Sequence, residues 1–187
     1  MDSISEKKNL PQKQNNQGIT WKTDFWTQKT SILYNRKEIG FFKMNIWKYK
    51  RAKGMLLDRE FQIKPINFWG TKVVIIDKID ERIIATISTD MWSGRTELYV
   101  EKDNETFIFK QNMWSTGNWW WERKLSETEK QEQKKLAIPN EKLVHNSISN
   151  FLTGEGKFNF GNTGESNLNA LILGGIFIMK MRQQAAG

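Results

Sequence analysis

The sequence predicts an all-β domain in which a closed or nearly closed antiparallel β-barrel surrounds one buried C-terminal helix. Three observations lead to this fold class. Short runs in the middle of the chain alternate polar and apolar residues, tryptophan recurs about every 22 residues, and the segment 170–179 is apolar throughout. The chain has 187 residues with nine tryptophans and eleven phenylalanines, which is enough length and apolar surface for one domain with its own core.

The N-terminal residues 1–18 are polar and charged and contain no apolar run. We therefore expect a disordered lead there rather than a signal peptide, then a single domain over residues 19–182 and a flexible tail over 183–187. The chain contains no cysteine, which excludes disulfides, thiolate metal sites and cysteine nucleophiles. The lack of cysteine fits a reducing compartment, and we expect a cytoplasmic protein that is peripheral to the membrane.

Several runs in the middle of the chain have the period-two pattern of strands with one buried face. Examples are residues 82–88, 97–101 and 106–110, where the apolar side chains of each run fall on one side. Residues typical of turns separate such runs, as at Asp80-Glu81 and Asp103-Asn104. Short strands joined by brief turns indicate an antiparallel barrel or sandwich.

A weak internal repeat indicates how many strands there are. About 22 residues hold two strands and two turns, so each period corresponds to one hairpin and five periods to about ten strands. A sheet of that size tends to close, and a closed barrel of that width has room inside. The repeat is marked by five tryptophans at spacings of 21, 22, 23 and 22 residues: Trp26, Trp47, Trp69, Trp92 and Trp114.

The apolar C-terminal segment fits the interior of such a barrel. From Leu168 to Met179 it has 12 residues, about 18 Å of helix, whereas a bilayer span needs about 20 residues. We therefore expect no transmembrane segment but a central helix over about 167–182, surrounded on all sides because it has no polar face. Gly174 and Gly175 are unfavourable in a helix interior, so we expect neighbouring backbone or a large aromatic ring to lie against them. A buried strand is the alternative.

These features resemble the tubby-like superfamily, which includes the tubby C-terminal domain, the phospholipid scramblases and the LURP-one-related proteins. The run 170–181 (ALILGGIFIMKM) is similar to the terminal helix of scramblases. Segments 40–48 and 60–77 are similar to strands of small bacterial LURP-one-like proteins. The resemblance covers about residues 19–182 and implies a 12-stranded barrel threaded by a C-terminal helix. We therefore predict a closed antiparallel β-barrel of about 10–12 strands.

The chain also departs from that superfamily. Scramblases carry an acidic, calcium-linked stretch before the terminal helix, whereas half of segment 154–167 here is glycine or asparagine. The resemblance therefore does not extend to calcium binding or scrambling. The phosphoinositide-contacting residues of tubby align with no individual position of this chain, so none is carried over.

The candidate binding residues come from the charge distribution. The chain is basic, with a net charge of +8, and residues 36–64 hold nine Lys or Arg against three Asp or Glu. On a hairpin tip such cations can hold phosphates or anionic phospholipid headgroups, at about 1 kcal/mol per cation near an anionic surface. A solvated turn is the alternative. We predict a non-enzymatic binding or scaffold module whose headgroup-binding residues lie in 48-KYKRAK-53: Lys48, Lys50, Arg51 and Lys53.

A second hypothesis is single-stranded nucleic-acid binding through exposed tryptophans and neighbouring cations. The run 118-NWWWERK-124 interleaves aromatic and basic residues, as stacking surfaces do. On a strand Trp119 and Trp121 share one face and Trp120 takes the other, so only one face could serve. The alternative is that these residues pack in the core.

An enzyme is the third and weakest hypothesis. His145 is the only histidine, and residues 141–149 show no nucleophile elbow, so we expect no catalytic residue. Asp77, Asp80 and Glu81 are spaced like a turn rather than an EF-hand, and we expect neither a metal site nor a cofactor.

Two further segments complete the prediction. Segment 126–137 begins with a capping box, Ser126 with Glu129, and is charged on every side. It therefore predicts a short solvent-facing helix or a flexible excursion between strands. The glycine-rich segment 154–164 lacks the GxxxxGK[ST] order of a phosphate-binding loop, so we expect a loop or a bulged strand there.

Overall fold

The computed structural model describes residues 18–24, 26–45, 50–112, 115–136, 140–150, 154–161 and 165–186. These ranges contain twelve strands and two helices. The strands are β1 (Ile19–Thr23), β2 (Lys29–Tyr34), β3 (Lys37–Met44), β4 (Ala52–Leu56), β5 (Arg59–Pro65), β6 (Lys72–Asp77), β7 (Arg82–Thr89), β8 (Thr96–Val100), β9 (Glu105–Asn112), β10 (Ser115–Arg123), β11 (Lys142–Asn150) and β12 (Glu155–Phe160). The helices are α1 (Glu127–Leu136) and α2 (Glu165–Ala186). The expected N-terminal lead lies outside the described residues, apart from Gly18.

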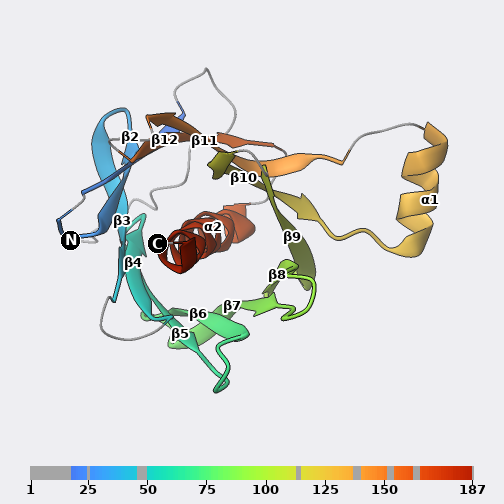
Figure 1. Ribbon diagram of the computed structural model, residues 1–187, viewed down its shortest axis with the longest axis horizontal. Helices are drawn as coiled ribbons and strands as arrows, with labels where there is room; N and C mark the ends of the chain where they lie inside the picture. Colours follow the sequence, from blue (N-terminus) through green and yellow to red (C-terminus); the bar gives the residue numbers. More distant parts are fainter. Residues whose placement is uncertain are drawn as a thin grey trace, which may run out of the picture.

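All twelve strands form one closed antiparallel barrel (Figure 1). Each strand pairs with the next one along the chain, and β12 returns to pair with β1, where Ile19 lies opposite Phe158. Closure satisfies the backbone groups that an edge strand would leave unpaired. The predicted fold class, a closed antiparallel β-barrel of about 10–12 strands around a C-terminal helix, is confirmed.

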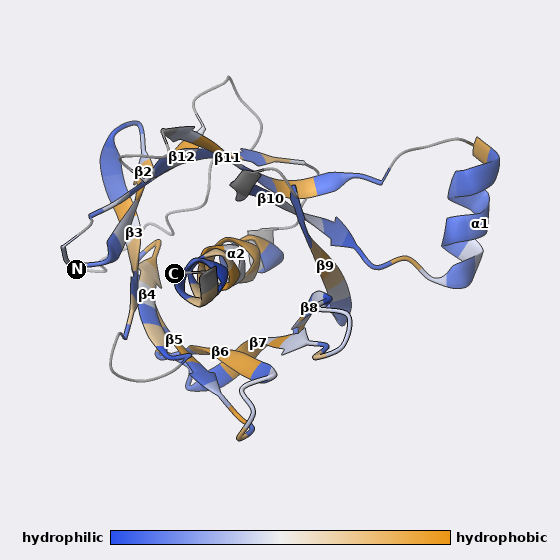
Figure 2. Ribbon diagram, viewed as in Figure 1, coloured by the Kyte–Doolittle hydropathy of each residue, from blue (hydrophilic) through white to orange (hydrophobic). Residues whose placement is uncertain are grey.

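Helix α2 lies inside the ring of strands (Figures 1 and 2). Every residue from Ala170 to Lys180 is buried, which is how a helix without a polar face avoids water. The helix begins two residues before the predicted range 167–182 and ends four residues after it, so residues 183–186 are helical where a flexible tail was expected. Within the described ranges, no helix has both the length and the apolar character needed to cross a bilayer.

Helix α1 projects from the barrel between β10 and β11 (Figure 1). The Ser126 hydroxyl accepts the N–H of Glu129 at 3.3 Å, and the Glu129 carboxylate accepts the N–H of Ser126 at 2.8 Å. This reciprocal pair is the predicted capping box. The helix has no buried residue, so the prediction of a solvent-facing helix is confirmed.

The connections between successive strands alternate between the two ends of the barrel. One end carries the connections that follow the odd-numbered strands, among them 24–28, 66–71 and 90–95, and we call it the tryptophan end. Trp26, Trp69 and Trp92 lie in these three connections, so each described period of the tryptophan repeat is one hairpin, as predicted. Trp47 and Trp114 lie outside the described residues.

The C-terminal part of α2 reaches the tryptophan end. Lys180 Nζ donates to Thr23 Oγ1 at 3.2 Å, and Arg182 Nη2 donates to the carbonyl of Gly94 at 3.4 Å. At the opposite end, the Asn167 side chain near the start of α2 donates to Glu105 at 2.8 Å. The helix therefore runs through the whole barrel, with its cationic end at the tryptophan end.

Candidate functional site

A surface pocket of about 510 Å³ opens at the tryptophan end, over strands β3 to β5. Ala52, Met44 and Ile63 are buried and supply its apolar base, while its polar members are exposed on the outside of the barrel or in the adjoining connections. The pocket is lined by Trp26, Thr27, Lys43, Met44, Asn45, Arg51, Ala52, Lys53, Gln62 and Ile63.

The pocket brings three cations together without a carboxylate in its lining. In the antiparallel register Lys43 lies directly opposite Lys53, and Lys53 lies opposite Gln62. Like charges in such cross-strand positions destabilise a sheet. Among the described residues no carboxylate forms an ion pair with Lys43, Arg51 or Lys53, so these charges are not neutralised by the described part of the chain. A bound anion would relieve this repulsion.

The next lysine in the same cross-strand row differs from the pocket lysines. Lys29 lies opposite Lys43 but pairs with Glu38 at 2.9 Å and lies over the ring of Phe41 at 5.2 Å. Hydrogen bonds from Ser31 and Lys29 lower the pKa of Glu38, so this carboxylate stays ionised beside the cation. The excess positive charge is therefore concentrated at the pocket and does not continue along the row.

The backbone around the pocket is held by hairpin bonds. The N–H of Asn45 donates to the carbonyl of Arg51 at 2.8 Å, which closes the connection between β3 and β4. On the other wall, Asp24 accepts the backbone N–H of Thr27 at 2.7 Å and its hydroxyl at 2.8 Å. The backbone bond from Thr27 is the main cause of the lowered pKa of Asp24. These bonds fix the turn that carries Trp26 at the rim of the pocket.

The four predicted binding residues have different outcomes. Arg51 and Lys53 line the pocket. Lys50 adopts a positive φ of 52° and its Nζ donates to the carbonyl of Gly70 at 2.9 Å, so it joins two connections of the tryptophan end and does not line the pocket. Lys48 lies outside the described residues.

Sequence reasoning did not single out Lys43, Trp26 or Gln62 as pocket residues. Lys43 is ten positions from Lys53, and only the strand register brings the two side by side. The sequence did contain one indication that Lys43 and Lys53 are neighbours, because both occupy outward-facing positions on two strands that form one hairpin. Trp26 was recognised as part of the repeat, but its place beside β3 follows from the pairing of β2 with β3.

The tryptophans of β10 do not form a stacking surface. Trp119 and Trp121 are completely buried against α2, so the hypothesis that they stack with nucleic-acid bases is wrong, and the core-packing alternative is confirmed. Trp120 faces outward, where Lys142 Nζ lies 4.4 Å from its ring centroid and the ring of His145 lies edge-on at 6.2 Å. Burial, followed by the charge of Lys142, lowers the pKa of His145, which is half-buried on this outer face.

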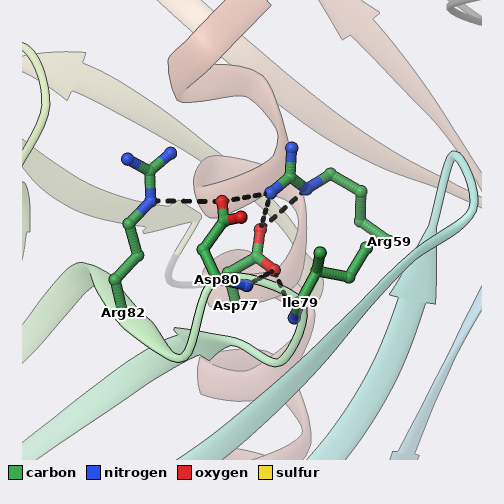
Figure 3. A network of polar contacts seen from close by, with 5 residues as sticks. All are labelled: Arg59, Asp77, Ile79, Asp80 and Arg82. Carbon is green, nitrogen blue, oxygen red and sulfur yellow. Dashed lines mark hydrogen bonds and ion pairs between the residues drawn. The ribbon is translucent and has the colours of Figure 1, made fainter.

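At the opposite end of the barrel, the aspartates at the end of β6 and in the turn after it form ion pairs with arginines (Figure 3). Asp77 is buried and accepts Arg59 Nε at 2.7 Å, while its other oxygen accepts the N–H of Ile79 at 2.9 Å. Asp80 pairs with Arg59 at 2.5 Å and with Arg82 at 3.5 Å. Asp77 is the last residue of β6 and accepts backbone N–H groups of the turn that follows, and Asp80 and Glu81 lie in that turn, as their spacing predicted. No group of three or more His, Asp or Glu side chains in the described ranges is arranged to hold a metal ion.

Comparison with known proteins gives this chain no assigned relative. The resemblance to the tubby-like superfamily stays a prediction, because a 12-stranded barrel around a helix is an architecture and does not by itself identify a superfamily. No family model, no curated protein and no solved structure matches the chain.

Proposed function

We propose that this protein is a non-enzymatic binding module that recognises anionic phospholipid headgroups at a membrane surface. The observation that supports the proposal is the pocket at the tryptophan end, where Lys43, Arg51 and Lys53 converge without a carboxylate in the lining. Its volume of about 510 Å³ is within the usual range for small-ligand sites.

The pocket chemistry suits a phosphate-bearing headgroup. The planar guanidinium of Arg51 can donate two parallel hydrogen bonds to a phosphate, and the two lysines supply point charges beside it. Asn45 and Gln62 add neutral hydrogen-bonding groups for the polar part of a headgroup. The pocket lies at the tryptophan end, so a membrane surface would approach it from that end of the barrel.

Sedimentation with vesicles tests the proposal. The protein is mixed with phosphatidylcholine vesicles that contain or lack phosphatidylserine, at low and at physiological salt. We expect binding only with phosphatidylserine and weaker binding at the higher salt, because salt screens exposed charges. A parallel competition with inorganic phosphate separates a lipid-surface ligand from a free anion. Phosphate is added only to concentrations that keep the total ionic strength below the physiological value. The proposal requires that vesicle binding stays largely intact under these conditions.

A charge-matched pair of triple variants locates the site. Replacing Lys43, Arg51 and Lys53 with glutamine should weaken vesicle binding about a hundredfold, from about 1 kcal/mol per cation. The control replaces three exposed lysines away from the pocket with glutamine: Lys37, Lys102 and Lys135. Equal losses in the two triple variants would show that net charge alone drives binding, and absence of binding at low salt would refute the proposal altogether.

A further inference from the structure

A three-residue pattern recurs in the connections of the tryptophan end. Each of the five spaced tryptophans follows an Asp or Asn by two positions and a large apolar residue by one. The connection between β11 and β12 has a related triplet that ends in leucine. The triplets are Asp24-Phe25-Trp26, Asn45-Ile46-Trp47, Asn67-Phe68-Trp69, Asp90-Met91-Trp92, Asn112-Met113-Trp114 and Asn150-Phe151-Leu152.

The sequences that follow the even-numbered strands, at the opposite end, have no aromatic residue at all: 35–36, 57–58, 78–81, 101–104, 124–141 and 161–164. The first four of these carry charged residues instead, as in Asp80-Glu81 and Glu101-Lys102-Asp103. Within the described residues, the aromatic residues of the connections therefore belong to the tryptophan end of the barrel. Such a one-sided distribution is not needed to form the barrel, whose core is made by the strands and α2.

The acidic or amide residue of each described triplet shapes the turn beneath the aromatic residue. Asp90 accepts the N–H of Trp92 at 2.8 Å and that of Ser93 at 3.3 Å. Asn67 plays a comparable part, since its side-chain oxygen accepts the N–H of Lys72 at 3.1 Å. Turns of this kind present the residues that follow the Asp or Asn to solvent in a defined position.

The apolar members of these described turns are exposed to water. The exposed fractions range from 69 to 99 % for Trp26, Phe68, Trp69, Met91 and Trp92. Phe68 and Trp69 contact each other edge-to-face at 5.3 Å, which leaves most of both rings uncovered. Large apolar groups gathered on one surface mark a binding site rather than a folding requirement.

The arrangement of the connections at the tryptophan end favours one kind of partner over others. The connections at one end of a closed barrel lie around a ring, so a flat partner can meet all of them, whereas a peptide or a nucleic-acid strand would meet only neighbouring ones. Tryptophan, with an apolar ring and a polar N–H, suits the boundary between headgroups and acyl chains. The cations of the pocket and Arg182 of α2 lie at the same end, which matches an anionic surface.

We propose that the barrel docks end-on onto an anionic bilayer, with Trp26, Phe68-Trp69 and Met91-Trp92 entering the headgroup–acyl boundary. This inference rests on the proposed headgroup binding, because the pocket cations supply the attraction that brings the tips to the surface. The triplets act as shallow anchors, and the opposite end of the barrel with α1 stays in water.

Site-specific fluorescence tests the orientation. The chain has no cysteine, so Ser93→Cys beside Trp92 and Lys102→Cys at the opposite end each give one labelling site for an environment-sensitive probe. Vesicles of phosphatidylcholine and phosphatidylserine then carry a nitroxide quencher on their acyl chains. We expect quenching and a blue shift at position 93 and neither at position 102. An unquenched probe at position 93 on sedimented protein would overturn end-on insertion and leave headgroup binding standing.

A matched pair of variants tests the anchors themselves. Trp69→Ser with Trp92→Ser should weaken vesicle binding about a hundredfold, at about tenfold for each large apolar side chain, while the requirement for phosphatidylserine remains. The control, Ile79→Ser with Ile83→Ser, removes two exposed apolar residues at the opposite end and should change binding little. Equal binding by both double variants would refute the anchors. Tryptophan-dependent self-association or oligonucleotide binding, with no vesicle binding, would refute both proposals in favour of another partner.

Discussion

Gly175 of α2 lies directly against the indole ring of Trp119 on β10. A Cβ added at Gly175 would overlap the Cη2 and Cζ3 atoms of Trp119, well inside van der Waals contact. The ring cannot move away easily, because it is completely buried and packs against two phenylalanines. The distance between ring centroids is 5.6 Å to Phe109 and 5.8 Å to Phe158. The missing side chain of Gly175 therefore sets how closely the helix and the barrel wall approach.

Gly175→Ala should therefore destabilise the fold, although alanine favours a helix by about 1 kcal/mol. Overpacking of this severity costs about 3 kcal/mol or more, and urea denaturation measures it. Gly174→Ala should be milder, because its nearest contact at 2.6 Å is the terminal methyl of Leu98. Trp119→Phe combined with Gly175→Ala should recover part of the loss. A stability of Gly175→Ala at or above that of the parent would contradict this packing.

The sequence was sufficient to predict this pair of elements but not the contact itself. An apolar helix with no polar face must be enclosed, and two adjacent glycines within it require a close neighbour. Which ring fills that space depends on strand register and on the rotation of α2, and neither is encoded in a local pattern. The pocket shows the same limit, since Lys43 and Lys53 become neighbours only through pairing of β3 with β4.

Local chemistry predicted other features well. The capping box of Ser126 and Glu129 needs only residues of one segment, and its bonds are present. Lys50 shows the opposite case, because its bond to Gly70 joins two connections that are far apart in sequence. Gly70 itself has a φ of 61°, and a Cβ there would lie 2.7 Å from Lys50 Cδ, so the approach of the two connections depends on a glycine.

A buried amide bridges three strands, and its loss should be costly. Asn146 on β11 accepts the indole N–H of Trp21 at 2.5 Å and donates to the carbonyl of Gly117 at 2.6 Å, and the amide is completely buried. Asn146→Leu keeps the volume but leaves both partners unsatisfied, which should destabilise the protein by about 2–4 kcal/mol. Adding Trp21→Phe to Asn146→Leu removes the indole N–H that would otherwise be buried without an acceptor. A double-mutant cycle by urea denaturation should therefore show that the loss in the double variant is smaller than the sum of the two single losses. Strictly additive losses would contradict the bridge.

The two aspartates around Arg59 should differ in their contribution to stability. Asp77 is buried with Arg59 bonded to it, whereas Asp80 is exposed and its pairs are screened by water. Asp77→Ala should cost about 3 kcal/mol, since it removes the partner of a partly buried cation and the acceptor of the turn N–H groups. Asp80→Ala should cost less than about 1 kcal/mol. Thermal unfolding of both variants checks this order, and equal losses would contradict it.

Lys180 makes the stability of the protein depend on pH in the alkaline range. Its side chain is 9 % exposed inside the barrel mouth, and its Nζ donates to Thr23 Oγ1 at 3.2 Å. Burial lowers the pKa of Lys180 from 10.5 to about 8. Between these values the unfolded chain holds a proton that the folded protein has released, so the free energy of unfolding rises with pH from about 8 to about 10.5. Below pH 8 the folded protein carries the full cost of a buried charge.

Lys180→Met should therefore be more stable than the parent at pH 7, by about 2–3 kcal/mol, since it keeps the apolar stem and removes the ammonium group. It should also lose the rise in stability between pH 8 and 10.5, whereas Lys102→Met, at an exposed position, should keep it. Urea denaturation at a series of pH values measures both effects. If Lys180→Met were less stable at pH 7, the bond to Thr23 would outweigh the burial of the charge, and the predicted dependence on pH would be wrong.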